Sequence, residues 1–286
     1  MQITALFKPS SIIGYLKFIR GINLFMVALT QYLTAIFLVG KRETWTQVLF
    51  DKGFFLMVSA TVMITAAGYL INDYYDVKID FVNKPQRVVV GKKLKRRWVL
   101  AGHTALNFGA IGLGFYISWP IGATMFGAAF LLWLYSNQLK RLPLVGNLSI
   151  AILTGLTLVL VAEFFQERTY IIACYAVFAA FITLVREIIK DVEDRKGDER
   201  FGCKTIPIIY GVAKTKVFLY LIMVIFSITV FILLHNISFI LPMVLLLTLT
   251  SLGYGIAKAD TVKGFHQLSG YCKLIMLLGV LSMIWI

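Results

Sequence analysis

The feature that most constrains this chain is its series of long apolar runs. A helix needs about 20 mostly apolar residues to cross a bilayer, and the 286-residue sequence supplies nine such runs. They cover residues 13–39, 54–76, 98–117, 119–138, 145–163, 170–190, 215–234, 238–257 and 267–286. With 59% hydrophobic and only 15% charged residues, the chain lacks the polar surface of a soluble domain. We therefore expect one all-α, polytopic membrane domain over residues 1–286, with nine transmembrane helices.

The net charge of +14 follows from the predicted topology. If the N-terminus lies in the cytoplasm, 24 of the 28 Lys and Arg residues fall on the cytoplasmic side of the nine runs. The positive-inside rule predicts this skew. It places the C-terminus on the opposite side and explains the positive charge without a nucleic-acid partner. The basic run KKLKRR at 92–97 is interpreted in the same way, as an anchor at the membrane surface.

The acidic residues are concentrated in two short stretches. Of the ten Asp and Glu residues on the predicted cytoplasmic side, nine lie in INDYYDVKID at 71–80, or in and just after REIIKDVEDRKGD at 186–198. Asn72, Asp76 and Asp80 are spaced at i, i+4 and i+8, so they share one face if their helix continues past residue 76. The interval i, i+3, i+7 occurs in both stretches, at Asp73, Asp76 and Asp80 and at Asp191, Asp194 and Asp198.

Two such columns of carboxylates suit a hard divalent cation. Like charges one turn apart repel each other, and oxygen ligands without a nearby Cys or His favour Mg²⁺. Because Mg²⁺ is often bound by one or two carboxylates together with substrate phosphates, carboxylates at the cytoplasmic mouth of an apolar bundle suit a lipid diphosphate. A solvated, salt-bridged helix end is the simpler explanation of a single acidic column, but it accounts poorly for two columns of matching interval on the same side. An ion-coupled transporter, the alternative of another class, would more often place its acids near mid-membrane.

Three segments together resemble the UbiA-type intramembrane prenyltransferases. NDYYDVKIDFVNKPQR (72–87) resembles the NDxxDxxxD signature of that superfamily, and DVEDRKGD (191–198) resembles its second aspartate-rich motif. YSNQLKRLPLVGN (135–147) is similar to the Tyr–Lys–Lys/Arg stretch that these enzymes carry after the fourth helix. The resemblance implies a bundle of nine helices around a central cavity, with two Mg²⁺ ions that hold an isoprenyl diphosphate between them.

The resemblance also implies the roles of individual residues. The implied metal ligands are Asn72, Asp73, Asp76 and Asp80 in the first motif and Asp191, Asp194 and Asp198 in the second. In many quinone-pathway members the second motif reads DxxxD, whereas Asp191 and Asp194 are three residues apart, so Glu187 is a further candidate ligand. Asp76, Asp191 and Tyr135 are the expected catalytic residues, although an aromatic at a helix end is equally well explained as an interfacial anchor.

Substrate-binding residues are expected at several polar positions near the motifs. They are Asn23, Lys84, Arg87, Tyr135, Lys140, Arg141, Arg186 and Lys204. The alternative for Lys140 and Arg141 is a role in topology alone, and the alternative for Asn23 is a hydrogen bond between packed helices. The run from REIIKDVEDRKGD to CKTIPIIYG resembles most closely the branch that makes digeranylgeranylglyceryl phosphate, which implies geranylgeranyl transfer to the hydroxyl of an anionic lipid. Arg186, Lys190 and Lys140 would then bind the acceptor phosphate. The alternative within the superfamily is an aromatic acceptor of quinone biosynthesis, either dihydroxynaphthoate or 4-hydroxybenzoate.

Overall fold

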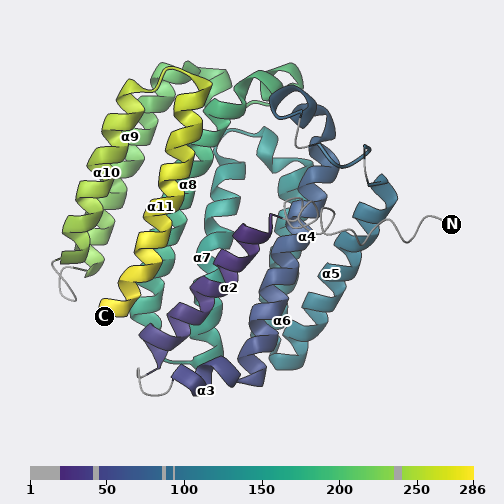
Figure 1. Ribbon diagram of the computed structural model, residues 1–286, viewed down its shortest axis with the longest axis vertical. Coiled ribbons are helices and arrows are strands. Elements are labelled where there is room, and N and C mark those ends of the chain that lie inside the picture. The colour runs from purple at the N-terminus through teal and green to yellow at the C-terminus, as the bar shows by residue number, and fades with distance from the viewer. Residues whose placement is uncertain (1–19, 41–44, 86–87, 93, 235–239) are drawn as a thin grey trace, which may run out of the picture. The chain divides into compact units, whose positions relative to one another are not determined.

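The computed structural model describes residues 20–40, 45–85, 88–92, 94–234 and 240–286, and these are helical almost throughout (Figure 1). Within these ranges there is no β-strand, and only an isolated bridge pairs Val90 with Leu94. In lipid, a helix satisfies its backbone N–H and C=O groups within its own segment, which is why chains this apolar adopt it. The predicted all-α class is confirmed.

Each predicted apolar run overlaps one long helical segment. The segments are α2 (Gly21–Leu33) continued by the π-helix η2 (Thr34–Val39), α4 (Lys52–Asn83), α5 (Arg96–Ile117), α6 (Trp119–Asn137), α7 (Val145–Phe165), α8 (Thr169–Arg200), α9 (Ile206–Leu234), α10 (Ile240–Lys258) and α11 (Val262–Ser282). In the described part of the chain, seven of them are long and apolar enough to cross a membrane, and α5 and the shorter apolar α10 are not among these seven. The polytopic membrane fold is therefore confirmed, whereas the count of nine spans stays a prediction.

The chain divides into two compact units, and it passes from one to the other at three places, the first of them inside α2. The first unit contains the described residues up to Thr30 together with Asp51–Ser136. The second contains Gln31–Phe50 and Asn137–Ile286. One acidic stretch lies in each unit, since residues 71–80 belong to the first and residues 186–198 to the second.

In the first unit, α4 packs against both α5 and α6. His103 of α5 is buried, and its Nδ1 lies 3.0 Å from the carbonyl oxygen of Ala67 in α4. On the side of α6, Gly68 makes room for Leu132, because a Cβ at position 68 would lie 2.9 Å from the Leu132 Cδ1 atom. Such close packing by small residues is common between membrane helices. It fixes the middle of the helix that carries the first acidic stretch.

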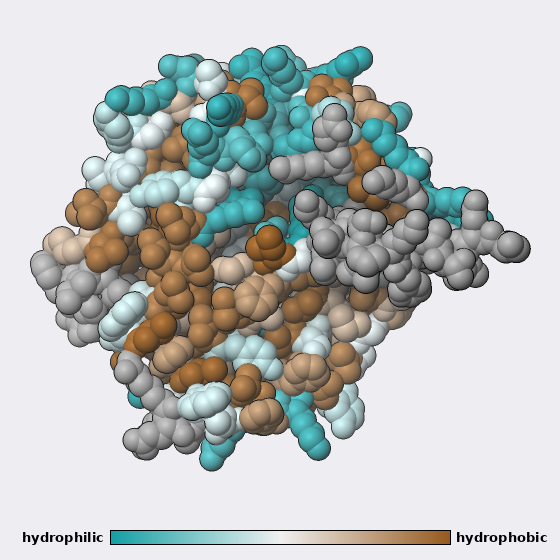
Figure 2. Space-filling view, in the orientation of Figure 1, coloured by the Kyte–Doolittle hydropathy of each residue, from teal (hydrophilic) through white to brown (hydrophobic). Residues whose placement is uncertain are grey.

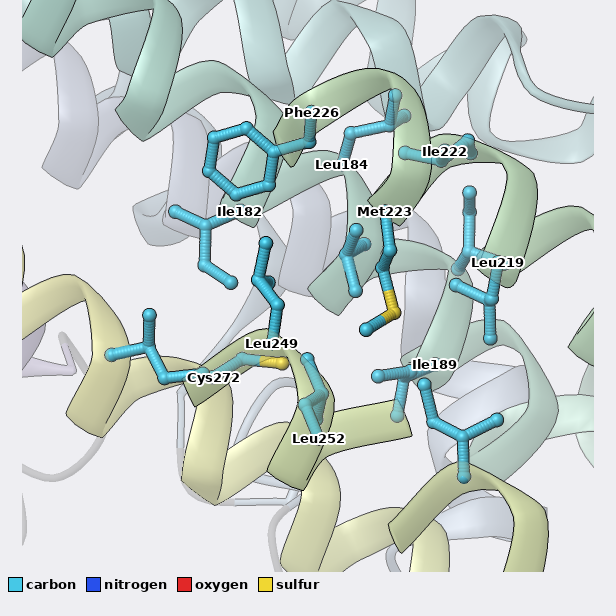
Figure 3. Packing of buried hydrophobic residues seen from close by; sticks show 14 of the residues in the cluster. Ile182, Leu184, Ile189, Leu219, Ile222, Met223, Phe226, Leu249, Leu252 and Cys272 are labelled. Carbon is cyan, nitrogen blue, oxygen red and sulfur yellow. The ribbon is translucent and has the colours of Figure 1, made fainter. Parts of the chain in front are cut away.

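In the second unit, α8 is the central helix and contacts α7, α9 and α11. A cluster of buried apolar residues joins it to its neighbours (Figure 3). Ile182 and Ile189 of α8, Phe226 of α9, Leu252 of α10 and Cys272 of α11 are all fully buried members of this cluster. Figure 2 shows apolar residues predominating over the middle of the α11 face, with polar residues gathered toward the end of the unit where α8 ends.

The two helices that carry the acidic stretches are also the longest. α4 and α8 have 32 residues each, which corresponds to about 48 Å at the usual rise per residue. Because the hydrocarbon core of a bilayer is about 30 Å thick, each helix can span it and continue for roughly three further turns. The predicted continuation of the helix through residues 72–80 is confirmed, since α4 ends only at Asn83.

The chain after the second acidic stretch forms a sharp bend. Gly211 interrupts α9 with φ 80° and ψ 163°, a backbone conformation that glycine adopts without steric cost. Residues 206–210 therefore form a short separate helical turn, and the apolar run predicted from residue 215 begins just beyond the bend.

Candidate active site

The first carboxylate group consists of Asn72, Asp73, Asp76 and Asp80, and it lies in the last turns of α4. All four residues are partly exposed, and the helix places Asn72, Asp76 and Asp80 on one face as predicted. The charges of Asp73 and Asp76 both act on Asp80, so these carboxylates lie close enough to repel one another. A cation bound among them would relieve this repulsion.

Arg20, which immediately precedes α2, contacts the first carboxylate group. Its Nη2 donates a hydrogen bond to Asp73 Oδ1 at 3.0 Å, and its guanidinium lies 4.7 Å from the centre of the Tyr69 ring. Burial alone would lower the pKa of Arg20, but the negative charges of its neighbours, Asp73 first among them, leave this pKa above its ordinary value. Arg20 was not predicted as a site residue. It adds a permanent positive charge beside the group.

Three of the predicted substrate-binding residues of the first unit are described by the structure, and each interacts with the first carboxylate group or with Arg20. Lys84 caps the C-terminus of α4: its backbone N–H donates to the Asp80 carbonyl at 2.8 Å, and its charge acts on the Asp80 carboxylate. Tyr135 lies near enough to Arg20 to interact with it electrostatically. Asn23 is in the first turn of α2, where its backbone N–H donates to the Arg20 carbonyl at 2.7 Å. The predicted ligand Arg87 lies outside the described residues.

The basic run at 92–97, interpreted from the sequence as a membrane anchor, also contacts the acidic end of α4. Arg96 lies 4.4 Å from the centre of the Tyr74 ring, and its Nη2 donates to the Tyr74 carbonyl at 3.1 Å. Lys92 Nζ lies 4.4 Å from the centre of the Phe81 ring. Both cations therefore hold the chain after α4 against the helix turns that carry the first carboxylate group.

The second carboxylate group consists of Asp191, Asp194 and Asp198, all in the last third of α8. The charges of Asp198 and Glu187 both act on Asp191, so like charges gather here as they do in the first group. Asn147, at the start of α7, donates a hydrogen bond from Nδ2 to Asp191 Oδ2 at 2.9 Å. Asn147 is buried, and it was not predicted as a site residue.

Glu187 is held by two basic side chains of its own helix. Its Oε1 accepts a short hydrogen bond from Arg186 Nη1, and its Oε2 lies 3.2 Å from Lys190 Nζ. The charge of Lys190 also acts on the neighbouring Asp191 carboxylate, so both cations lie among carboxylates. Arg186 also has a buried Nε that makes no hydrogen bond within the described residues. The structure thus holds Arg186 and Lys190, two of the three predicted ligands of an acceptor phosphate, close to one carboxylate.

The loop between α6 and α7 folds against the start of α7 and against the chain after α8. The loop contains the short helix η4 (Leu139–Arg141), and the Arg141 carbonyl accepts a hydrogen bond from the Lys204 N–H at 2.7 Å. Gly146 allows the close approach, because a Cβ there would lie 2.7 Å from Lys140 Cα. The Cys203 N–H in turn donates to the Asp198 carbonyl at 2.9 Å. The structure therefore brings Lys140, Arg141 and Lys204 to the end of α8 that carries the second carboxylate group.

Both carboxylate groups fit Mg²⁺ by donor type, as open sets of ligands. Within the described ranges, no three His, Cys, Asp or Glu side chains form a group that could by itself hold a metal ion. Mg²⁺ does not require such a cage, because it is commonly bound by one or two carboxylates, water and substrate phosphates. The carboxylates that gather in each group are of this kind, and basic side chains that suit phosphate lie next to them.

A helical membrane protein with groups of carboxylates and basic side chains near the ends of two long helices has the features expected of an intramembrane prenyltransferase. The chain belongs to the UbiA prenyltransferase family, whose sequence pattern matches residues 28–265. The resemblance seen in the motifs is confirmed, and the protein is a membrane enzyme that transfers prenyl groups. The alternative of an ion-coupled transporter is set aside.

Several relatives and solved structures resemble the chain over most of its length. The digeranylgeranylglyceryl phosphate synthase of Methanosphaera stadtmanae is 30% identical over 273 residues, which are 94% of this chain and 97% of that protein. The enzyme of the same name from Methanobrevibacter smithii is 35% identical over 204 residues, 69% of each chain. A UbiA homolog from Archaeoglobus fulgidus, solved with DMAPP and Mg²⁺, matches 95% of this chain and 99% of its own with a TM-score of 0.66 at 15% identity. The structural match supports the fold.

Proposed function

We propose that this protein transfers a geranylgeranyl group from geranylgeranyl diphosphate to the free hydroxyl of geranylgeranylglyceryl phosphate, in a reaction that depends on Mg²⁺. The observation that carries the proposal is the near full-length similarity, at 30% identity, to a protein named digeranylgeranylglyceryl phosphate synthase. The geometry of the second unit supports it, because Arg186 and Lys190 lie together and can donate hydrogen bonds to an acceptor phosphate.

Each carboxylate group would hold one Mg²⁺ ion, with Asp76 and Asp80 in the first group and Asp191 and Asp198 in the second as the main ligands. Asn72, Asp73 and Asp194 remain candidates beside them. Bound Mg²⁺ would neutralise the negative charge that develops on the diphosphate leaving group. Glu187 is less suited to this role, since both of its oxygens already contact cations.

Basic side chains would hold the two phosphate-bearing substrates. Lys84, Arg87, Lys140, Arg141 and Lys204 are assigned to the diphosphate as point charges and hydrogen-bond donors. Arg186 and Lys190 are assigned to the acceptor phosphate, with Arg186 as the planar, bidentate donor. Asn23 is assigned to the substrate headgroup.

The reaction exchanges one carbon–oxygen bond for another. The bond between C1 of the geranylgeranyl group and the diphosphate oxygen breaks, and the acceptor hydroxyl oxygen forms the ether bond to C1. The hydroxyl proton is released, so the products are the ether lipid, diphosphate and a proton. The Tyr135 ring would stabilise the positive charge that develops at C1, as aromatic faces do for cations.

The active site would open to the cytoplasm. The distribution of Lys and Arg along the sequence supports a cytoplasmic N-terminus and a C-terminus on the opposite side. Both carboxylate groups then fall on the cytoplasmic side, where water-soluble diphosphate can leave. The whole chain, residues 1–286, would act as one prenyltransferase domain.

The proposal is tested with purified protein in detergent, Mg²⁺ and labelled geranylgeranyl diphosphate. Parallel reactions receive geranylgeranylglyceryl phosphate, dihydroxynaphthoate or 4-hydroxybenzoate, and both diphosphate release and labelled lipid are measured. We expect an ether lipid in the first reaction alone. A product with an aromatic acceptor alone would keep the prenyl transfer but overturn the acceptor, and would leave Arg186 and Lys190 without the phosphate assigned to them.

A further inference from the structure

In each carboxylate group, one aspartate accepts a hydrogen bond from a residue earlier in the chain: Asp73 from Arg20 and Asp191 from Asn147. We infer that Asn147 is a positioning residue that orients Asp191 for metal binding without neutralising its charge. The inference rests on the proposed function, because it takes Asp191 as a Mg²⁺ ligand. Its direct basis is the hydrogen bond of 2.9 Å from Asn147 Nδ2 to Asp191 Oδ2.

Asn147 is itself held in place by the backbone around it. It is 7% exposed and lies in the first turn of α7. The residue before it, Gly146, packs against the backbone of residues 139 and 140 so closely that no side chain would fit. Leu144, just before the helix, adopts φ 64°, a conformation that non-glycine residues rarely occupy and that persists only where the surroundings impose it. The amide is therefore presented from a rigid support.

The corresponding contact in the first unit is of a different kind. There Asp73 pairs with Arg20 at 3.0 Å, and the guanidinium cancels the charge of the carboxylate. Arg20 lies just before α2 and Asn147 lies in the first turn of α7, so each comes from chain that precedes the acidic helix. The amide of Asn147 donates a hydrogen bond but carries no charge. Asn147 therefore holds the Asp191 carboxylate without pairing it with a cation, whereas Asp73 is paired with Arg20.

A residue that hydrogen-bonds a metal-binding carboxylate affects the metal affinity of that carboxylate. Groups that hydrogen-bond a ligating carboxylate fix its orientation, and their removal typically weakens metal binding by about 10- to 100-fold. In the free protein, Asp191 also experiences the like charges of Asp198 and Glu187. Without the amide of Asn147, we expect the carboxylate to rotate away from these neighbours.

The test measures metal binding directly, apart from turnover. Full-length protein in detergent is titrated with Mn²⁺ in the presence of geranylgeranyl thiodiphosphate, an unreactive substrate analogue, and free Mn²⁺ is followed by electron paramagnetic resonance. The variants are Asn147→Ala, which removes the amide, and Asn147→Leu, which replaces it with an apolar side chain of similar size. Ser149→Ala is the matched control: Ser149 is buried in the same helix, but its hydroxyl donates to the Val145 carbonyl of α7 itself. Asp191→Asn is the reference for the loss of the second site.

We expect both Asn147 variants to bind one of two Mn²⁺ ions at least tenfold more weakly, with the Ser149→Ala variant unchanged. Asp191→Asn should lose that same ion. If the Asn147 variants melt at lower temperature but bind Mn²⁺ like the wild type, Asn147 serves packing alone and the inference is wrong. If Asp191→Asn keeps full Mn²⁺ binding, the metal assignment in the proposed function fails instead. If one of the two Asn147 variants does not fold, the Mn²⁺ titration of the other tests the inference.

Discussion

Substitution of Gly146 by Ala is predicted to damage the site through the backbone. Gly146 lies in the first turn of α7, and an added Cβ would lie 2.7 Å from Lys140 Cα, 2.9 Å from the Leu139 carbonyl oxygen and 3.1 Å from Lys140 N. All three neighbours are main-chain atoms, so no side chain can rotate away. Carbon atoms in contact normally lie about 3.5–4.0 Å apart. The segment that carries Lys140 and Arg141 must therefore move by roughly 1 Å.

The magnitude follows from two opposing effects. In a helix without a clash, Gly→Ala stabilises by about 0.5–1 kcal/mol, because alanine loses less conformational freedom. Overpacking of this kind costs about 1–3 kcal/mol. We expect a net loss of about 1–2 kcal/mol in the free energy of unfolding, and a rise in KM for the prenyl diphosphate, because Lys140 and Arg141 are displaced with the loop.

Gly270→Ala in α11 is the matched control, since nothing lies within 4 Å of a Cβ at that position. It should be neutral or stabilising and should leave KM unchanged. The assay compares thermal unfolding in detergent and steady-state kinetics of both variants with the wild type. If Gly146→Ala behaves like Gly270→Ala in both measurements, the close approach of residues 139–140 to α7 is not what positions the loop, and the reasoning is refuted.

Three further predictions concern the metal and the charges. Removal of divalent cations with EDTA should stop prenyl transfer, and added Mg²⁺ should restore it; turnover that persists in EDTA would contradict the metal assignment. Asp76→Ala and Asp191→Ala should each abolish turnover with normal membrane insertion, measured by product formation and fractionation, and activity in both would contradict the two-ion proposal. Reversal of the charges at 92–97 should disturb the topology reported by protease protection. Normal insertion with a large loss of turnover would show that the contacts of Arg96 with α4 matter more.

The helices could be predicted from the sequence because a segment that crosses lipid must satisfy its own backbone hydrogen bonds, which a helix does. Apolar length predicts where a helix lies, and the i, i+4, i+8 spacing of Asn72, Asp76 and Asp80 predicted that α4 continues past the apolar run. Local departures were not predicted. The π-helix η2 contains Thr34, whose hydroxyl donates to Met283 Sδ at 3.5 Å, a partner almost at the other end of the chain. Such contacts depend on tertiary packing, which periodicity does not encode.

The candidate site residues that lie in sequence motifs could be predicted. Those that join the site only through a partner far away in the sequence could not. Lys140, Arg141 and Lys204 were assigned from motifs, and the structure places them together through the Lys204–Arg141 hydrogen bond. Arg20 and Asn147 were missed, although a signal existed for both. Each is a polar residue within a predicted apolar run, which is the feature that selected Asn23. The pairing itself spans 53 residues for Arg20 and Asp73 and 44 residues for Asn147 and Asp191, which no local spacing rule reaches.

The presence of Glu187 between two cations follows from the cost of burying charge. Arg186 and Lys190 are largely buried, with 17% and 29% of their side chains exposed, and two unpaired cations in such a place would be strongly destabilising. The Glu187 carboxylate lowers that cost, because it contacts both cations, and the charge of Lys190 also acts on Asp191. Under the proposed function, an acceptor phosphate would bind Arg186 and Lys190 while both still contact Glu187. Neither cation would then be left without a carboxylate when the product departs, so binding and release need not expose a buried, unpaired charge.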